Sequence, residues 1–195
     1  MTLDEKKTSL EKLNKKISIC QKCSLGQSRT HTVPGEGVVD ARIVFIGEAP
    51  GRNEDLKGVP FVGRAGKVLD ELLLSILLNR SQIFILNILK CRPPQNRPPL
   101  ESEVSACADH LDSQLKIIDP KVIVTLGNSA TRHIFRKFDL PEFKIGDVVG
   151  KSYNIDLGGR KKTVIPLYHP AVAVYNSKKI NDLKNDFKVL KQFLG

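Results

Sequence analysis

The chain has 195 residues, of which 41% are apolar and 27% charged, as is typical of one globular domain with its own core. These values exclude a disordered or collagen-like chain, and no apolar run reaches the roughly 18 residues that a membrane helix needs. The formal net charge is +10, from 31 Lys and Arg against 21 Asp and Glu. Such an excess favours a polyanionic partner, most often nucleic acid, although a basic surface can also serve solubility alone.

The N-terminal residues 1–16 are rich in charged side chains and contain no apolar h-region, so we expect no secretory signal. We therefore expect a cytoplasmic protein whose thiols stay reduced. Four cysteines in that compartment favour ligation of a metal or a cluster over disulfides.

Four short apolar runs predict strands that are buried on both faces, as in a parallel sheet. The runs cover residues 43–46, 83–86, 122–126 and 164–167, and helical patterns lie at 68–77, 104–115 and 180–193. The alternation predicts an α/β protein, a three-layer α/β/α sandwich, in a single domain over residues 1–195.

The carboxyl ends of the strands are where open α/β sheets bind their ligands. The residues at the four predicted ends are Gly47–Gly51, Asn87, Gly127–Ser129 and Tyr168–Ala171. We interpret the Gly127 end as structural, because Asn128 and Ser129 are typical helix caps. The other three ends carry residues with reactive or hydrogen-bonding side chains that a simple turn does not need, so the candidate site lies there.

The cysteines form one short pair, Cys20 and Cys23, and one wide pair, Cys91 and Cys107. Cys107 falls on the apolar face of a helical pattern, where a buried thiol can be a small hydrophobe. The other three lie among Lys, Arg, Gln and Pro, which favours ligation. Zinc prefers two short pairs and an iron–sulfur cluster tolerates wider spacing, and the spacing alone leaves both open.

Four side chains near the strand ends are candidates for function. Glu48 lies in a Gly-Glu-Ala-Pro-Gly turn and is either a helix-start carboxylate or a catalytic group. Phe61, in a glycine-flanked loop, is either a core aromatic or a stacking platform for a planar ring. Asn87 offers a donor and an acceptor, which match the N3–H and O4 edge of uracil. A single histidine is more often structural than catalytic, but the position of His169, beyond a strand end and before a proline, shifts the balance towards catalysis.

Seven segments of the chain together match one known family. They are Cys20–Cys23, Val33–Gly37, Gly47–Gly51, Pro60–Gly66, Leu86–Pro99, Cys107 and His169–Asn176. Each match is weak alone, but the segments occur in the family's order over almost the whole chain. In them the chain resembles family 4 uracil-DNA glycosylases, the iron–sulfur branch of the uracil-DNA glycosylase superfamily.

The resemblance implies an activity, hydrolysis of the N-glycosidic bond of deoxyuridine in single- or double-stranded DNA, by a monomer. It implies a four-stranded parallel sheet and catalytic roles for Glu48 and His169, with His169 facing uracil O2. It also implies a 4Fe-4S cluster that joins the N-terminal segment to the 91–107 insertion. The implied cluster ligands are Cys20, Cys23, Cys91 and Cys107, and the implied uracil-binding residues are Gly47, Ala49, Phe61, Asn87 and His169.

Two further features come from the same resemblance. Ala49 stands where a fast-acting branch of the superfamily has a water-positioning Asp and where cross-linking relatives have Gln, so this chain manages without either. Val172 is implied as a wedge that enters the duplex, whereas the structural alternative packs residues 172–175 on the last helix. Independently of the resemblance, the cysteines and the basic charge leave one functional alternative, a non-catalytic iron–sulfur protein that binds DNA or senses redox state.

Overall fold

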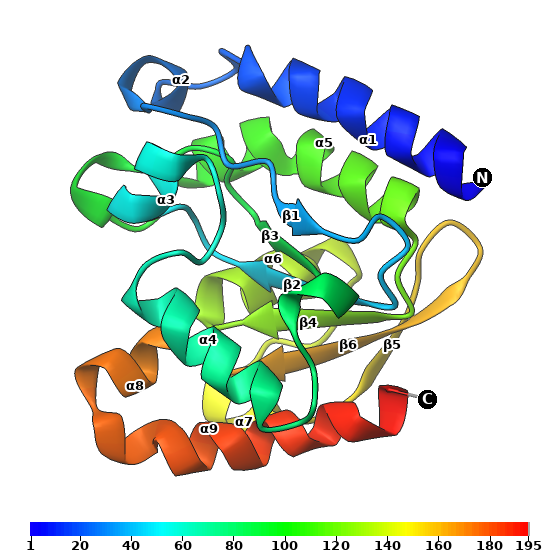
Figure 1. Ribbon diagram of the computed structural model, residues 1–195, viewed down its shortest axis with the longest axis vertical. Helices are drawn as coiled ribbons and strands as arrows, with labels where there is room; N and C mark the ends of the chain where they lie inside the picture. The colour runs from blue at the N-terminus through cyan, green and yellow to red at the C-terminus, as the bar shows by residue number, and fades with distance from the viewer. Residues whose placement is uncertain (195) are drawn as a thin grey trace.

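The computed structural model describes residues 1–194. Their strands form one mixed sheet with the order β1-β3-β2-β4-β6-β5 (Figure 1). Its strands are β1 (Glu36–Gly37), β2 (Ile43–Gly47), β3 (Phe84–Asn87), β4 (Val122–Leu126), β5 (Tyr153–Asp156) and β6 (Lys161–Leu167). The four strands predicted from apolar runs are the parallel ones, β3-β2-β4-β6.

The expected number of four strands is too low, because β1 and β5 add an antiparallel edge on each side. Both residues of β1 are exposed, and only Ile155 of β5 is buried. Neither strand therefore has the continuous apolar run of a strand covered on both faces.

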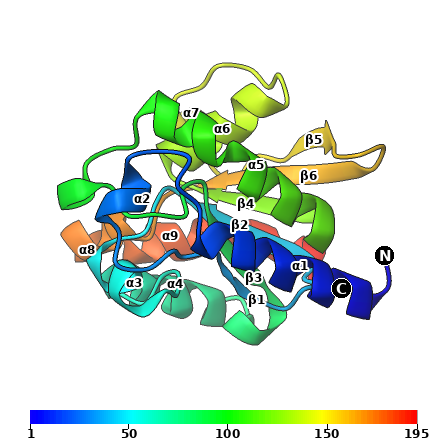
Figure 2. The same cartoon turned by 90° about the horizontal axis from the view of Figure 1, so that it is seen from above.

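Helices cover both faces of the sheet, so the predicted three-layer α/β/α sandwich is confirmed (Figures 1 and 2). Helices α1, α5 and α6 pack on one face, and α4, α8 and α9 on the other. No helix within residues 1–194 has the length and apolar content to span a membrane. The bounds are α1 (Leu3–Ser18), α2 (Leu25–Ser28), α3 (Arg52–Lys57), α4 (Arg64–Leu74), α5 (Glu101–Ile118), α6 (Asn128–Lys137), α7 (Ile145–Val148), α8 (Ala171–Tyr175) and α9 (Ile180–Phe187), with 3₁₀ turns η1 (Arg80–Gln82), η2 (Pro94–Asn96), η3 (Ser177–Lys179) and η4 (Lys188–Phe193).

Strand β2 contributes to both cores because its side chains alternate between the two faces. Val44 and Ile46 belong to the core under α1 and α5, and Ile43 and Phe45 to the core above α4 and α9. The Phe45 ring stacks on Phe187 of α9, with ring centroids 6.1 Å apart. The sheet is thus apolar on both sides.

The strand register brings the carboxyl ends of the parallel strands to one edge. Gly47 of β2 pairs with Asn87 of β3, and Leu126 of β4 pairs with Leu167 of β6. In Figure 1 the arrowheads of β4 and β6 point to the left, where α3 and α8 lie. The segments that follow the four strands therefore meet there.

Candidate active site and cysteine-lined cavity

A pocket of about 460 Å³ opens at the carboxyl edge of the sheet, a volume typical of ligand sites. Gly47 lies directly beneath it, since a Cβ at this position would be 2.5 Å from Asn87 Oδ1 and 2.8 Å from the Phe61 ring. Five of the residues predicted from the sequence line the pocket, namely Glu48, Ala49, Phe61, Asn87 and His169.

Asn87 closes the inner end of the pocket. Its side chain is only 2% exposed, and its Oδ1 has no hydrogen-bond partner. A buried amide oxygen without a partner costs free energy, so an orphan of this kind usually has a functional explanation. A ligand that presents an N–H group to Oδ1 would satisfy it.

Phe61 is held in an unusual backbone conformation, with φ +52°, in the left-handed region that bulky residues rarely adopt. The guanidinium of Arg80 donates hydrogen bonds to the carbonyls of Pro60 and Phe61. Gly66 lets α4 approach this loop, because a Cβ there would be 1.8 Å from the Phe61 carbonyl oxygen. The aromatic ring is therefore positioned by surrounding structure.

Glu54 of α3 supports the same loop from the opposite side. Its Oε1 accepts hydrogen bonds from the amides of Val62 and Gly63, at 2.9 and 2.8 Å. The carboxylate also lines the pocket, and burial lowers the pKa of His169 by more than the charge of Glu54 raises it. No motif in the sequence predicted that Glu54 lies in the pocket.

His169 faces Phe61, with ring centroids 5.6 Å apart and ring planes at 27°. Its Nδ1 accepts a hydrogen bond from the amide of Ala171, at 3.1 Å, so the proton of the neutral ring lies on Nε2. Burial lowers the pKa of His169 to about 4, and the charge of Glu54 offsets only part of that shift. At neutral pH His169 is therefore an uncharged N–H donor.

Glu48 is paired with Ser129, whose hydroxyl donates to Glu48 Oε2. The prediction that Asn128 and Ser129 cap α6 is wrong, because Gly127 is the N-cap and no side chain caps the helix. Gly127, Asn128 and Ser129 also line the pocket, so this strand end lies at the candidate site as well. All four parallel strands contribute to the site.

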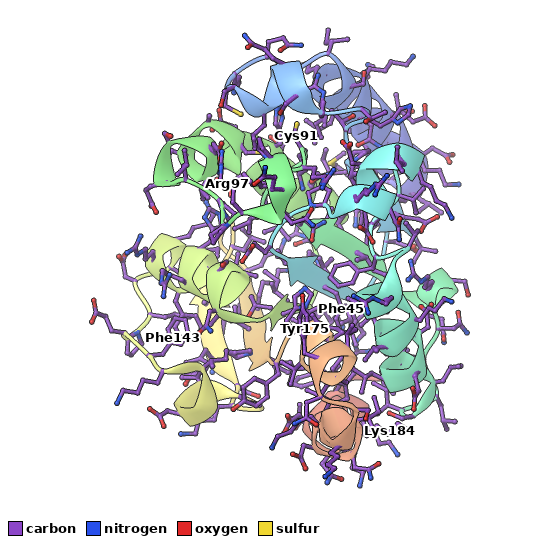
Figure 3. The ribbon with its side chains drawn as sticks, turned by 90° about the vertical axis from the view of Figure 1, so that its left-hand side faces the viewer. Phe45, Cys91, Arg97, Phe143, Tyr175 and Lys184 are labelled. Carbon is purple, nitrogen blue, oxygen red and sulfur yellow. The ribbon has the colours of Figure 1, made fainter. Side chains whose placement is uncertain are left out.

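Tyr175 is a second pocket residue that was not predicted from the sequence. It lines the pocket from the end of α8 and is 86% exposed, at the centre of the view in Figure 3. Val172, the expected wedge, is partly buried against the core of α4 and α9. Exposure of a large aromatic is visible only after folding, so no sequence signal could separate Tyr175 from its neighbours.

The four cysteines, all free, line a second cavity near α1, α2 and α5. In Figure 3 Cys91 lies between the blue N-terminal segment and the green segment leading into α5. Arg29 Nη1 donates to Cys91 Sγ at 3.3 Å, and His110 Nε2 is 3.3 Å from Cys20 Sγ. The structure therefore brings together all four predicted ligands.

Burial raises the pKa of the Cys91 thiol to about 11, although Arg29 opposes the shift, and burial also raises the pKa of Cys107. Burial lowers the pKa of Lys90, another lining residue, to about 8. Within residues 1–194, no three His, Cys, Asp or Glu side chains are arranged to hold a single metal ion. All four cysteines line one small cavity.

Comparison with known proteins identifies the family. Residues 34–193 match the model of the uracil DNA glycosylase superfamily. Type-4 uracil-DNA glycosylases are similar to this chain over nearly its whole length: the Sulfurisphaera tokodaii enzyme is 49% identical (94% of this chain, 84% of the relative), and the Archaeoglobus fulgidus enzyme 48% (96% and 94%). This chain belongs to the type-4 uracil-DNA glycosylases.

The matched ranges differ in which cavity residues of the glycosylase they contain. The family model begins at residue 34 and thus contains the pocket residues but not Cys20 and Cys23. The type-4 relatives leave only a few per cent of the chain unmatched, so their similarity reaches the cysteine pair as well. The short pair therefore lies in the part shared with type-4 members.

The tautomer and charge of His169 can be tested by ¹⁵N NMR of the ring nitrogens. We expect a neutral ring with the proton on Nε2 at pH 7 and a titration midpoint near 4, because burial disfavours the imidazolium. Glu54→Gln should lower the midpoint further, since the carboxylate stabilises the cation. A midpoint near 6.5 in the wild-type protein would contradict this account of His169.

Proposed function

We propose that this glycosylase hydrolyses the N-glycosidic bond of deoxyuridine in DNA, releasing uracil and leaving an abasic site. The observation that carries the proposal is the buried, unpartnered Oδ1 of Asn87 beside the Phe61 ring. The Asn87 amide can accept from uracil N3–H and donate to O4, and the Phe61 ring offers a stacking face. Uracil is thereby recognised at both its edge and its face.

The base must leave the helix to reach this pocket, at a cost of a few kcal/mol when it is paired. The net charge of +10 favours binding of the phosphate backbone, independent of sequence. We propose that a monomer, one domain over residues 1–195, acts on single- and double-stranded DNA. Single strands spare the cost of unstacking.

Cleavage breaks the bond between uracil N1 and C1′, and its electron pair stays on uracil, spread onto O2. The Nε2–H of His169 donates to that developing charge, as an oxyanion donor does. A water oxygen then bonds to C1′, and the proton that this water loses neutralises the released uracil anion, directly or through solvent. Glu48, held by Ser129, accepts a hydrogen bond from this water and stabilises the cationic sugar by its charge.

We propose that the cysteine-lined cavity holds a 4Fe-4S cluster and not a zinc ion, as the resemblance to family 4 implies. Four thiolates can ligate either group, and a cluster tolerates the wide spacing of Cys91 and Cys107. The hydrogen bond from Arg29 to Cys91 Sγ suits an anionic sulfur. When bound, the cluster cross-links the N-terminal segment to the 91–107 insertion, and hydrolysis needs no electron transfer from it.

The first test is excision from a uracil-containing oligonucleotide by the purified protein. Asn87→Ala should cut the single-turnover rate severely and leave DNA affinity nearly intact, because the desolvated base edge loses its partners. Asn181→Ala, at an exposed amide on α9, serves as the control. No excision by the wild type would refute the function and favour the binding or redox alternative. Unchanged kinetics of folded Asn87→Ala would refute the role of Asn87.

His169 should act mainly in the transition state, where charge on O2 first appears. We expect His169→Ala to lower the single-turnover rate on the order of 100-fold, the scale of a lost oxyanion donor. Affinity for DNA with an uncleavable uracil analogue should change much less. His31→Ala, at an exposed histidine outside the pocket, is the control. Equal losses of rate and affinity would mean that His169 binds the ground state.

The metal content tests the cluster. Protein purified without oxygen should be brown and hold about four irons per chain. Cys107→Ser should lose iron and stability, because the link to the N-terminal segment is removed. Stoichiometric zinc without iron or sulfide would overturn the proposal.

The segment that opens the duplex is proposed to be α8. Changing Val172 to Ser should reduce excision from duplex more than from single strands, which have no stack to open. Tyr175→Ala belongs in the same assay, because Tyr175 is the exposed side chain beside the pocket. For either residue, equal losses on both substrates would exclude a wedge.

A further inference from the structure

Lys90 is a buried cation between the two cavities. Its side chain is 1% exposed, and its Nζ donates a 2.7 Å hydrogen bond to the backbone carbonyl of Asn87. No carboxylate in the part of the chain that the structure describes pairs with it. A buried ammonium with one carbonyl partner is expensive, so another negative group must offset its charge.

Lys90 lines the cysteine cavity together with all four cysteines. In the proposed cluster these cysteines are bound as thiolates, and their negative charge offsets that of the Lys90 ammonium. Four thiolates around a cluster carry a net negative charge, and a cation buried in the same wall is its natural counter-ion. Arg29 contacts Cys91 from another side but has no bond to Asn87, as its partners are Cys91 and the carbonyls of Ser18 and Cys20.

The same lysine bears on the uracil pocket. Asn87 is the last residue of β3, and the chain runs from it directly to Cys91. The amides of Ile88 and Leu89 tie this turn to the carbonyls of Gly47 and Glu48, and the Lys90 ammonium ties it to Asn87 from the cysteine side. The amide that reads the base is thus anchored through its own backbone to the wall of the cysteine cavity.

We propose that Lys90 is a positioning residue that couples the two sites: its charge is held by the cluster's thiolates, and its hydrogen bond sets the Asn87 backbone for reading uracil. This inference rests on the proposed function and cluster. It assigns the cluster a purpose in base recognition without a role in bond cleavage.

The test compares Lys90→Met with Arg29→Met in the iron-loaded enzyme. Each variant removes a cation near the thiolates, so both should lower the reduction potential of the cluster. Only Lys90→Met should lower the single-turnover rate, about 10-fold to 100-fold, as small misplacements of a binding group do. It should also reduce the preference for DNA with an uncleavable uracil analogue over undamaged DNA.

A double-mutant cycle gives the sharpest readout. On an Asn87→Ala background, Lys90→Met should cause no further loss, because both changes act on one interaction. Fully additive losses, or an iron-loaded Lys90→Met with the wild-type rate and preference, would overturn the inference. If Lys90→Met does not hold iron, Lys90→Gln replaces it in both experiments. Its side chain is uncharged and shorter than that of lysine, so we expect it to lose the hydrogen bond to the Asn87 carbonyl and to give the same results.

The two proposals fail separately. A wild-type protein that holds iron but excises no uracil refutes the proposed function, whatever the potentials of the variants. A wild-type protein that excises uracil, with Lys90→Met equal to it in rate and preference, refutes only the coupling.

Discussion

The parallel pairing of β2 with β3 is the interaction on which the pocket depends. Its register sets Gly47 opposite Asn87, and the amides of Ile88 and Leu89 extend the pairing beyond the strands. Because Gly47 has no side chain, the Asn87 amide and the Phe61 ring occupy the space above it. A shift of one residue would turn Asn87 to the other face of the sheet and dismantle the site.

The Phe61 loop shows how the pocket is prepared before a ligand arrives. A left-handed backbone at a bulky residue costs about 1 to 3 kcal/mol and persists only where the surroundings impose it. Arg80, Glu54 and Gly66 impose it here, from three separate elements. In the proposed function this rigidity spares the enzyme the cost of ordering its stacking face during binding.

In the proposed function the two cavities have different roles. The pocket holds the groups that contact the base and the sugar, and these groups catalyse hydrolysis, which needs no electron transfer. The cysteine cavity joins segments far apart in the chain, yet Cys91 is only a short turn from Asn87. Through that turn a structural cross-link can affect base recognition while staying outside the chemistry.

The sequence by itself determined the parallel strands, the main helices and the strand ends that carry Glu48, Asn87 and His169. Continuous apolar runs and helical periodicity report the burial of each segment, and that property is local. The resemblance added the family, which the comparisons confirm.

Only the tertiary structure decided which partners these residues have. The edge strands β1 and β5, the bond from Ser129 to Glu48 and the support of the Phe61 loop by Glu54 were not predictable. Lys90, of a residue type that is almost never fully buried, is among the most deeply buried side chains. The reason is physical: a pattern along the chain encodes how far a residue is buried, but its partners come from register and packing between distant segments.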